Sequence, residues 1–435
     1  MKIRKVIKSD SVKDFLSLFF SNVLQKVFGL IREIIVASIF GSTLLYANYL
    51  LLRTVSDSFS QFTVGNALKA NLLPKFTKVL EKYKEVSLIK VFDFSKKTMV
   101  LLFVLSQIIQ FLIIWYLDTD YTLELILISV LLSLSISFNF LNTIYLTFIQ
   151  AQGKFLKYSL VTTLHSFLVV ILIKPLTLLC GIIGLALSRL FGILTLTFSY
   201  ILPMNKQQEG FEVELSRKDF NLPTLILGNF ANIIILSSRF VSGADGGRDI
   251  AYFTYSVFIL NAFMTSVVGN ISTLLLRKVS INKNNIFMLY SLIISSFISI
   301  SLVICFHFFS NDIIDFIYRR VMSFFSGQQG AFTTSDVKNT SKYLYELSYS
   351  FIFLFIATTL FQPFFTLSIE KSKKARRNIA FIFLSVILLG FIYSYFSDLE
   401  VYEESLIMIY SSSFVSVVLS IYSYYYYLRK HNESF

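Results

Sequence analysis

The sequence predicts an all-α polytopic membrane protein with about 12 transmembrane helices in two six-helix lobes around a central cavity. Three observations support this fold class. The chain of 435 residues is 55% hydrophobic and only 15% charged, with a mean hydropathy of +0.68, whereas soluble domains carry about 25% charged residues. Apolar stretches of about 20 residues, enough to cross a hydrocarbon core of about 30 Å, recur along the whole chain. They are continuous rather than alternating, which argues against a transmembrane barrel.

The apolar stretches define twelve predicted spans. With the N-terminus assigned to the cytoplasm, the cytoplasmic segments hold 27 Lys and Arg residues and the outer loops hold six. Positive side chains accumulate on the cytoplasmic side, so we expect both termini in the cytoplasm. The net charge of +13 therefore indicates topology and contact with anionic membrane lipid, not a nucleic-acid partner. The predicted spans are residues 12–40, 44–68, 98–117, 122–150, 157–174, 177–203, 219–243, 249–276, 284–309, 343–369, 378–396 and 402–428.

The chain also reads as an internal duplication. With an offset of 204 residues, the segment from Ala47 in span 2 aligns with the segment from Ala251 in span 8, and the tripeptide Val-Gly-Asn at 64–66 meets the same tripeptide at 268–270. Six spans on each side of a polar segment predict two parallel lobes related by an axis along the membrane normal. We expect an N-terminal lobe at 1–203, a cytoplasmic linker at 204–218 and a C-terminal lobe at 219–435.

Ionisable residues lie where apolar helices are predicted. Each costs about 2.5–3.5 kcal/mol at the centre of a membrane helix, so such residues usually line an internal cavity or pair with each other. Lys26 and Glu33 are seven residues apart and share a helix face, whereas Arg32 points about a third of a turn away. The simplest interpretation is a hydrated cavity of net positive charge that binds an anion. The candidate binding residues are Lys26, Arg32, Glu33, Arg53, Asp57 and Arg239.

A structural interpretation competes with the functional one at several of these positions. Lys26 lies close enough to the cytoplasmic end of its span to extend its ammonium to the interface. Arg53 and Asp57, spaced i,i+4, could form a purely structural ion pair. Arg239 lies near the outer end of its span and could simply meet water. The lone histidines His165 and His307 are interpreted as packing residues.

The sequence lacks the patterns of an enzyme. Cys180 and Cys305 lie in different spans and form no disulfide framework or metal motif. The long outer loop 310–342 contains no acid–base pair, and no phosphate-binding glycine loop occurs. We therefore predict no catalytic residues, no metal site and no cofactor. The basic N-terminal segment lacks a small-residue cleavage site, so we expect it to be retained.

Four segments resemble the MurJ-type flippases. The stretch VFGLIREIIVASIFG at 27–41 resembles their first helix, which carries a Gly-x-x-Arg-Asp element followed by a Phe-Gly turn. The stretch at 56–84 matches their second helix with its basic cytoplasmic helix, and GAFTTSD at 330–336 fits their Gly-x-Phe-Thr-x-x-Asp stretch. FQPFFTLSIEKSKKAR at 361–376 fits their aromatic turn before a basic loop. The resemblance covers most of the chain in order.

The resemblance implies a flippase of the multidrug, oligosaccharide-lipid and polysaccharide exporter superfamily in a bacterial inner membrane. Such a protein moves an undecaprenyl-pyrophosphate-linked glycan, lipid II or a related species, across the membrane by alternating access. The family's early cavity arginine falls on Lys26, and its Arg-Asp pair falls on Arg32 and Glu33. Its partners would be the glycan-lipid, anionic lipid and, as an open question, a coupling ion. We expect a monomer.

Several family features are missing. The family's second-helix arginine falls nearer Ser60, two turns from Arg53, and its eighth-helix arginine falls on or near Ser256. The family usually has fourteen spans, against twelve predicted here. A capsule or O-antigen repeat-unit exporter is therefore a rival, and a cation-coupled multidrug antiporter of the same fold is a further alternative. The antiporter reading requires cation-binding carboxylates, whereas Glu33 and Asp57 each accompany an arginine.

Overall fold

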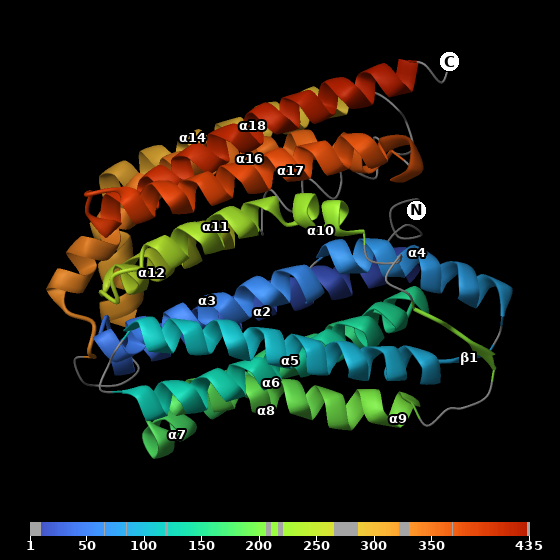
Figure 1. Cartoon of the computed structure of the whole chain (residues 1–435), viewed down its shortest axis with the longest axis horizontal. Coiled ribbons are helices and arrows are strands. Elements are labelled where there is room, and N and C mark those ends of the chain that lie inside the picture. The colour runs from blue at the N-terminus through green and yellow to red at the C-terminus, as the bar shows by residue number, and fades with distance from the viewer. Residues whose placement is uncertain are drawn as a thin grey trace, which may run out of the picture. The chain divides into compact units, whose positions relative to one another are not determined.

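The structure is a computed structural model that describes residues 10–64, 66–83, 85–117, 121–205, 210–215, 221–264, 286–321, 330–367 and 369–432. These residues are almost entirely helical, which confirms the all-α polytopic class (Figure 1). Eleven of the twelve predicted spans coincide with a helix or a pair of helices over their described part, and the span 177–203 covers the end of one helix, a turn and the helical segments that follow it. The proposed repeat can be followed only in part, because residues 65 and 268–270 lie outside the described ranges.

The chain forms two compact units, which we describe separately. Unit 1 comprises residues 1–36 and 51–225, and unit 2 comprises residues 37–50 and 226–435. The predicted division at 204–218 differs from this grouping at two places. The segment 37–50 packs with the C-terminal part of the chain, and residues 219–225, predicted to begin the C-terminal lobe, belong to unit 1. The segment 37–50 contains the end of the first predicted span and the start of the second.

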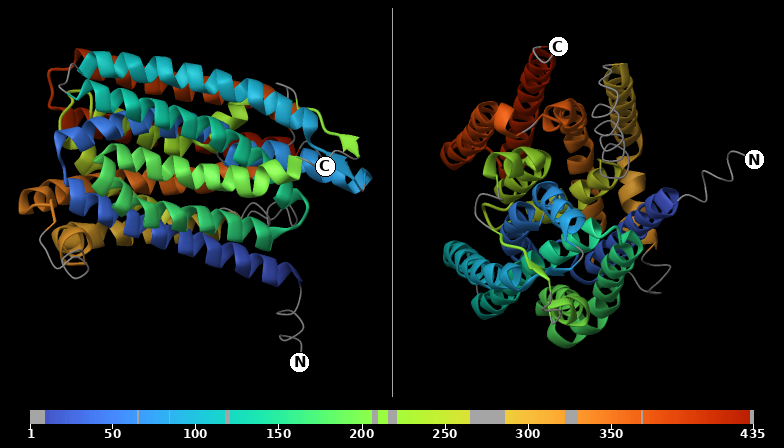
Figure 2. Two further views of the ribbon diagram at one scale, coloured as in Figure 1. Left: turned by 90° about the horizontal axis from the view of Figure 1, so that it is seen from below. Right: turned by 90° about the vertical axis from the view of Figure 1, so that its right-hand side faces the viewer.

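Most helices of unit 1 are long and run side by side (Figure 2). Helices of 26 to 31 residues extend for roughly 39–47 Å at 1.5 Å per residue, which exceeds the hydrocarbon thickness. A π-helical turn, Thr197–Ile201, prolongs the shorter helix that ends at Leu196. The helices are α2 (Asp10–Phe40), α3 (Leu44–Val64), α4 (Asn66–Lys82), α5 (Ile89–Leu117), α6 (Thr122–Ala151), α7 (Phe155–Cys180), α8 (Ile183–Leu196), α9 (Leu202–Asn205) and α10 (Leu222–Gly228).

Unit 2 is built around α16, which packs against α12, α14 and α18. The neighbouring α18 faces α16 and α17 with small residues that let helix backbones approach closely. Six serines of α18 are buried. The helices of unit 2 are α11 (Phe230–Val241), α12 (Asp249–Phe263), α14 (Ile286–Asp315) with a π-helical continuation at Phe316–Arg320, α16 (Thr334–Phe365), α17 (Ile369–Phe396) and α18 (Val401–Asn432).

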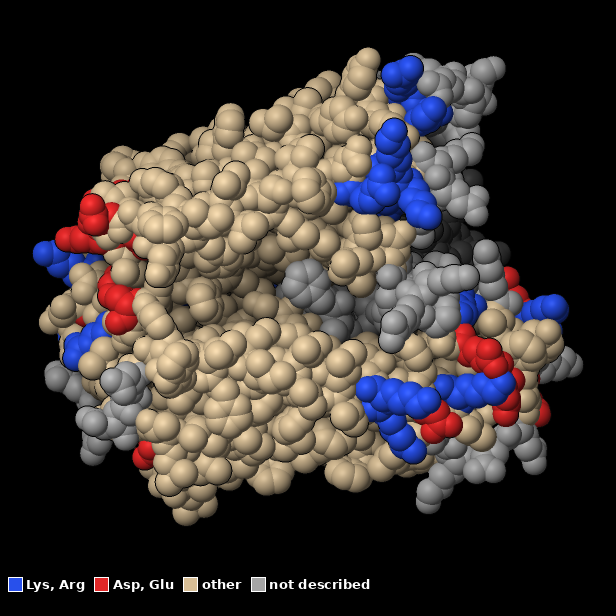
Figure 3. All heavy atoms as spheres, in the orientation of Figure 1, with Lys and Arg blue, Asp and Glu red and all other residues tan. Residues whose placement is uncertain are grey.

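Eight of the described helices are each long and apolar enough to cross a membrane. The pair α10 and α11, bent by 74° between Gly228 and Phe230, would be a ninth span. On the face shown in Figure 3, charged side chains gather near the helix ends of each unit and the middle is uncharged. The helices α2 and α3, which carry five of the six predicted ionisable residues, are not among the eight.

Polar side chains inside unit 1 bond across helix pairs. Gln107 and Gln110 of α5 donate to Ser129 and Ser133 of α6, over 2.7 and 3.2 Å. Asn142 donates to the Ile193 carbonyl over 3.1 Å and accepts from Thr197 over 2.8 Å, where the π-helical turn begins. Hydrocarbon offers no hydrogen-bond partner, so such groups must be satisfied internally. Asn142 therefore joins α6 to α8.

One buried cation of unit 2 also has an internal role. Arg376 of α17 is 2% exposed. Its guanidinium donates to the carbonyl oxygens of Leu367 at 2.9 Å and Phe364 at 3.5 Å, just past and within the last turn of α16. Cations favour the C-terminal ends of helices, where the last carbonyls lack intrahelical partners. The basic segment after the aromatic turn thus supplies a helix cap as well as surface charge.

A short β-clasp holds part of the predicted linker against unit 1. The strands β1 (Val86–Ser87) and β2 (Phe211–Glu212) pair in parallel, and the ring of Phe211 stacks on Tyr83 with centroids 3.9 Å apart. Val213 and Leu215 are buried in the hydrophobic core of the unit. Lys90 pairs with Glu212 at 3.1 Å and with Glu214. The linker between the two predicted lobes is therefore anchored next to α5.

We expect the apolar contacts to dominate the clasp. Burying a Val side chain contributes about 1.5–3 kcal/mol, whereas a fully exposed ion pair contributes little because water and salt screen the two charges. Val213→Asp should therefore accelerate proteolysis within residues 204–218 far more than Glu214→Gln does, measured by limited digestion of the purified protein. Equal acceleration by both variants would contradict this ranking.

The ion pair adds a pH dependence of known sign. The hydrogen bond from Lys90 holds the pKa of the Glu214 carboxyl below its usual value. The contribution of a carboxyl with a depressed pKa is complete above its ordinary pKa and is lost as pH falls through the depressed value. Digestion of the linker should therefore not change between pH 8 and about pH 5, and should rise only on further acidification.

Candidate functional site

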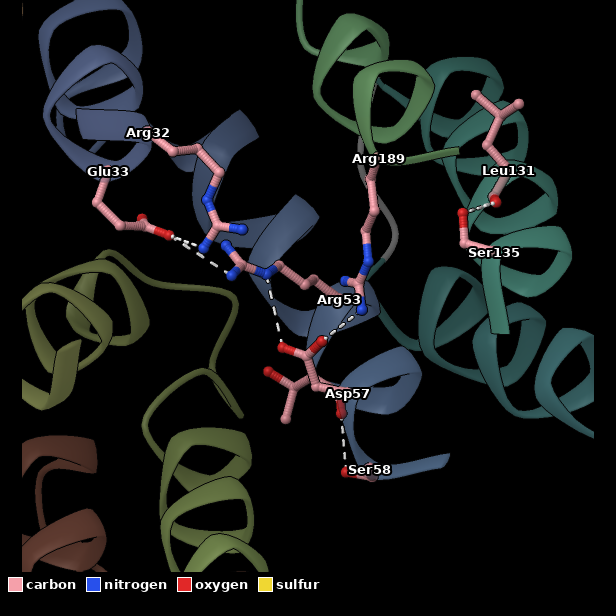
Figure 4. A network of polar contacts seen from close by, with 9 residues as sticks. Arg32, Glu33, Arg53, Asp57, Ser58, Leu131, Ser135 and Arg189 are labelled. Carbon is pink, nitrogen blue, oxygen red and sulfur yellow. Dashed lines mark hydrogen bonds and ion pairs between the residues drawn. The ribbon is translucent and has the colours of Figure 1, made fainter. Parts of the chain in front are cut away.

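The candidate site of unit 1 is a chain of ion pairs centred on Arg53 of α3 (Figure 4). The Arg53 guanidinium lies 3.5 Å from a Glu33 oxygen on α2 and 3.5 Å from an Asp57 oxygen one turn further along α3. The i,i+4 spacing predicted the second contact, because such residues share a helix face. The structure adds the first contact, so Arg53 bridges two carboxylates from different helices.

Each carboxylate also binds a second arginine. Arg32 lies 2.6 Å from the same Glu33 oxygen, and Arg189 of α8 donates to Asp57 over 3.0 Å. Arg32 and Glu33 leave α2 in directions about a third of a turn apart, but the long Arg32 side chain still reaches the Glu33 carboxylate. Arg189 was missed in the sequence, although a lone arginine in the predicted span 177–203 was the same signal that marked the other positions.

We call these five side chains the arginine cluster: Arg32, Glu33, Arg53, Asp57 and Arg189. Three guanidinium groups against two carboxylates leave one net positive charge. Glu33 is 2% exposed at its side chain, whereas Arg32 is 31% exposed and Arg189 is 22% exposed. The carboxylates thus lie deeper than the ends of two arginines.

The cluster can bind an anion. A guanidinium group offers five N–H donors in a planar fork that matches a carboxylate or phosphate. Contacts of 3.5 Å are long for hydrogen bonds, so Arg53 engages both acids loosely. Charges removed from water interact strongly, and the excess positive charge favours an incoming anion over a cation. Among the described residues, no group of three or more His, Cys, Asp or Glu could hold a metal ion.

Two predicted residues are not part of the cluster. Lys26 belongs to α2 of unit 1 but is exposed and makes no ion pair with any described residue. Arg239 of α11 is 7% exposed and belongs to unit 2, so it is not at an exposed outer end as one interpretation held. His165 of α7 packs against Gly192 of α8, where an added Cβ would lie 2.9 Å from the ring nitrogen Nδ1.

A second polar centre lies in unit 2 at Asp336, within the motif GAFTTSD. Its carboxylate accepts hydrogen bonds from the Thr333 amide at 2.7 Å, the Tyr252 hydroxyl at 3.3 Å and the Ser42 hydroxyl. Asp336 and Thr333 also form a capping box that begins α16. The motif therefore does two jobs, since it starts a helix and binds the segment 37–50.

Backbone contacts fix the same segment. The amide of Ala331 donates to the Ser38 carbonyl over 2.7 Å, and the Tyr255 hydroxyl donates to the Gly41 carbonyl over 2.8 Å. Gly41 has φ +53°, and a Cβ there would lie 2.5 Å from the Ala331 carbonyl oxygen. Only glycine fits this turn without strain. We call residues 37–50 with their partners around Asp336 the Asp336 hub.

Comparison with known proteins finds likeness in structure only. No protein-family model and no curated protein matches the sequence. Among solved structures, the chain is similar to the lipid II flippase MurJ in an inward closed conformation, with 20% identity and a TM-score of 0.73 over 96% of this chain and 87% of that one. It is also similar to a multidrug resistance MATE family transporter in an inward-facing conformation, with 14% identity and a TM-score of 0.60 over 93% and 94%.

A third similar structure is a transporter of the MOP superfamily from Pyrococcus furiosus, described as having a binding pocket of reverse polarity. Its identity is 13% and its TM-score 0.59, over 95% of this chain and 94% of that one. At these identities the comparisons show a shared fold. The chain therefore has the fold of these transporters and flippases.

Glu33 should be the most sensitive carboxylate of the cluster, because it is the most buried and holds two guanidinium groups. Removing one partner of a buried ion pair costs about 3–5 kcal/mol. We expect Glu33→Gln to lower the thermal stability of the detergent-purified protein clearly. Asp93→Asn, which removes an exposed pair with Lys96 on α5, should change it little. Equal melting temperatures for both variants would show that Glu33 is not holding a charged network.

Proposed function

We propose that the protein is a flippase that moves a polyprenyl-pyrophosphate-linked glycan across the bacterial cytoplasmic membrane by alternating access. The observation that carries this proposal is the arginine cluster. Three half-buried guanidinium groups with a net positive charge occur within a fold shared with a lipid II flippase. A pyrophosphate is the anion that such a cluster fits best, because each guanidinium can bind two phosphate oxygens.

The roles of the individual residues follow from their exposure. Arg32 and Arg189, at the ends of the cluster, would donate to the pyrophosphate, while Glu33 and Asp57 hold the guanidinium groups in place. Lys26, which is exposed on a different face of α2 from Arg32, would attract the anionic head group before it reaches the cluster. Arg239, on α11 of unit 2, remains a candidate substrate-binding residue. The protein would act as a monomer, without cofactor or metal, among anionic membrane lipids.

Two rivals are weaker but share the fold. A multidrug antiporter carries a cation, and both carboxylates of the cluster are already bound by two arginines each. The charge balance therefore disfavours a cationic substrate. A capsule or O-antigen repeat-unit exporter carries the same polyprenyl pyrophosphate with a different glycan. The cluster recognises the shared part of both lipids, and the glycan has to be found by experiment.

The Asp336 hub supports alternating access. Helices α2 and α3 carry the cluster in unit 1, yet the segment that joins them, 37–50, packs in unit 2. A movement between the two units must bend these helices or release the hub. The hub is held by hydrogen bonds around the Asp336 carboxylate, by bonds to the Ser38 and Gly41 carbonyls and by the stacking of Tyr46 on Tyr255, so its release would break all of these contacts together.

The proposed orientation can be tested with two single cysteines. The end of unit 2 with exposed Lys373, Lys374 and Arg377 should face the cytoplasm, and the end with Asp398 should face outward. In a background with Cys180 and Cys305 replaced by serine, because both are exposed, Asp398→Cys should react with an impermeant maleimide in intact cells. Lys374→Cys should react only after lysis. The reverse pattern would overturn the topology.

Transport should depend on the cluster arginines. A hydrogen bond to a charged group contributes about 1.5–3 kcal/mol, so losing the one made by Arg32 or Arg189 should slow transport about ten- to hundredfold. In cells depleted of the native protein, we expect Arg32→Ala to be unable to restore growth. Arg32→Lys should restore growth only in part, because the planar guanidinium fork is lost. Lys96→Ala, an exposed cation on α5, is the matched control.

The readout is the lipid that accumulates on the inner leaflet when the protein is depleted, identified by mass spectrometry. A polyprenyl-pyrophosphate glycan should accumulate, and Arg189→Ala should not restore its export although the variant reaches the membrane. Normal export by well-expressed Arg32→Ala would exclude the anion-binding role. Unchanged polyprenyl pools with increased sensitivity to cationic dyes would support the antiporter instead.

A further inference from the structure

A cavity of about 510 Å³ opens at one end of unit 2. Its walls come from the loop before α12, the first turns of α16 and the loop between α17 and α18, which meet at the same end of the unit. It is separate from the arginine cluster, which belongs to unit 1. The lining residues are Asp245, Asp249, Tyr252, Asn339, Lys342, Tyr343, Leu399, Glu400, Val401 and Tyr402.

The wall mixes donors and acceptors. Asn339 offers an amide, Glu400 a carboxylate and Lys342 an ammonium group, and none of the three side chains has a hydrogen-bond or ion-pair partner in the described part of the chain. Although carboxylates line the same cavity, no oxygen of theirs lies within ion-pair distance of the Lys342 nitrogen. The polar groups are therefore spread around the cavity and not paired off against each other.

One buried hydroxyl on this wall has no partner. The Tyr402 hydroxyl is inaccessible to solvent and makes no hydrogen bond with any described residue. A buried polar group without a partner costs about 1–3 kcal/mol. The neighbouring ring of Tyr343 packs edge-on against Tyr402, with centroids 4.7 Å apart, and its hydroxyl donates to Asp249 over 3.1 Å. These contacts hold the wall in place.

The aromatic surface of the cavity is presented through Tyr402. The Lys342 ammonium lies over this ring, 3.7 Å from its centroid, and Lys342 is exposed. Its flexible side chain can move aside, since an exposed cation–π contact contributes only about 0.5–1 kcal/mol. An apolar ring face surrounded by an amide, carboxylates and an ammonium suits a ring-shaped molecule with many hydroxyl groups.

We propose that this cavity binds a sugar unit of the carried glycan, one that bears no acidic group. The volume holds one or two hexose rings and lies within the ordinary range of small-molecule sites. Three carboxylates against one lysine give the cavity a negative charge, which repels uronic acids and pyrophosphate. A metal ion is a poor fit, because the described acids do not converge on one point.

This inference rests on the proposed function for the source of the sugar. The positive-inside pattern would place the cavity on the outer face, where a translocated glycan emerges. The arginine cluster would then bind the pyrophosphate of the glycan-lipid. The cavity would bind a sugar of the glycan at a different stage of transport, when the glycan reaches the outer face.

Binding can be measured without transport. Saturation-transfer NMR on the purified full chain, with N-acetylglucosamine, glucosamine and glucuronate as probes, should give transfer to N-acetylglucosamine with a Kd of about 1–10 mM. Glucuronate should bind at least about fivefold more weakly, because like charges repel. Asn339→Ala should remove the signal, and Asp398→Asn, a neighbouring exposed residue outside the cavity wall, should preserve it.

Charge reversal provides a second variant that does not depend on loss of binding. Glu400→Lys should narrow or invert the preference between N-acetylglucosamine and glucuronate, since Glu400 is exposed and its replacement leaves the core intact. Absence of transfer to any neutral sugar would overturn the proposal. So would transfer that Asn339→Ala and Glu400→Lys leave unchanged. Binding of glucosamine alone would identify an amine site and reject a sugar site.

These outcomes separate this proposal from the flippase proposal. If depletion leaves all polyprenyl-linked pools unchanged while N-acetylglucosamine still binds through Asn339, the flippase proposal fails and the sugar site stands. If a glycan-lipid accumulates but no sugar binds, the flippase proposal stands and the cavity has no such role.

Discussion

Arg53 holds two carboxylates from different helices, and each of these carboxylates holds a further arginine. An isolated charge in hydrocarbon is prohibitively expensive, so each member of this chain is tolerable only because the others are present. This constraint bears on the packing of unit 1, since α2, α3 and α8 must lie close enough for the series of ion pairs to form. The one positive charge in excess is tolerable because the outer arginines, Arg32 and Arg189, are partly accessible to solvent.

Uncharged polar groups inside the membrane helices also need partners within the protein, but burying them costs less free energy than burying a charge. Glutamines of α5 bond to serines of α6, and Asn142 bonds α6 to α8. Such bonds between membrane helices contribute about 0.6 kcal/mol on average, enough to fix register without making the helices inseparable. In unit 2, buried serines on α18 allow close packing, and Arg376 caps α16. The buried polar residues thus form two groups. One group positions helices against each other, and the other, the arginine cluster, carries a net positive charge.

The features that could be predicted from the sequence are those that follow from hydropathy and helical periodicity. The helices follow from hydropathy, and the polar stripe of Arg53 and Asp57 follows from i,i+4 spacing. Arg189 could not be assigned, because nothing local to α8 says which helix it faces. The contact between Arg32 and Glu33 could not be derived from helix faces, since a Cβ direction does not fix the end of a four-bond side chain. The strands β1 and β2 lie 125 positions apart in the sequence and have two residues each. Strands this short leave no alternating pattern in the sequence that could predict them.

The position of the cluster relative to the unit boundary gives it a mechanical consequence. Glu33 lies one helical turn before residue 37, where α2 passes into unit 2, and Arg53 lies three residues after Leu50, where α3 returns to unit 1. Helices transmit displacement over one turn with little loss, because their hydrogen bonds hold consecutive residues rigidly. A release of the Asp336 hub would therefore move the Glu33 and Arg53 side chains first. Their contacts of 3.5 Å are longer than those of Arg32 and Arg189, so in the proposed transport cycle they are the ones that a small helix movement would exchange for contacts to the proposed anion.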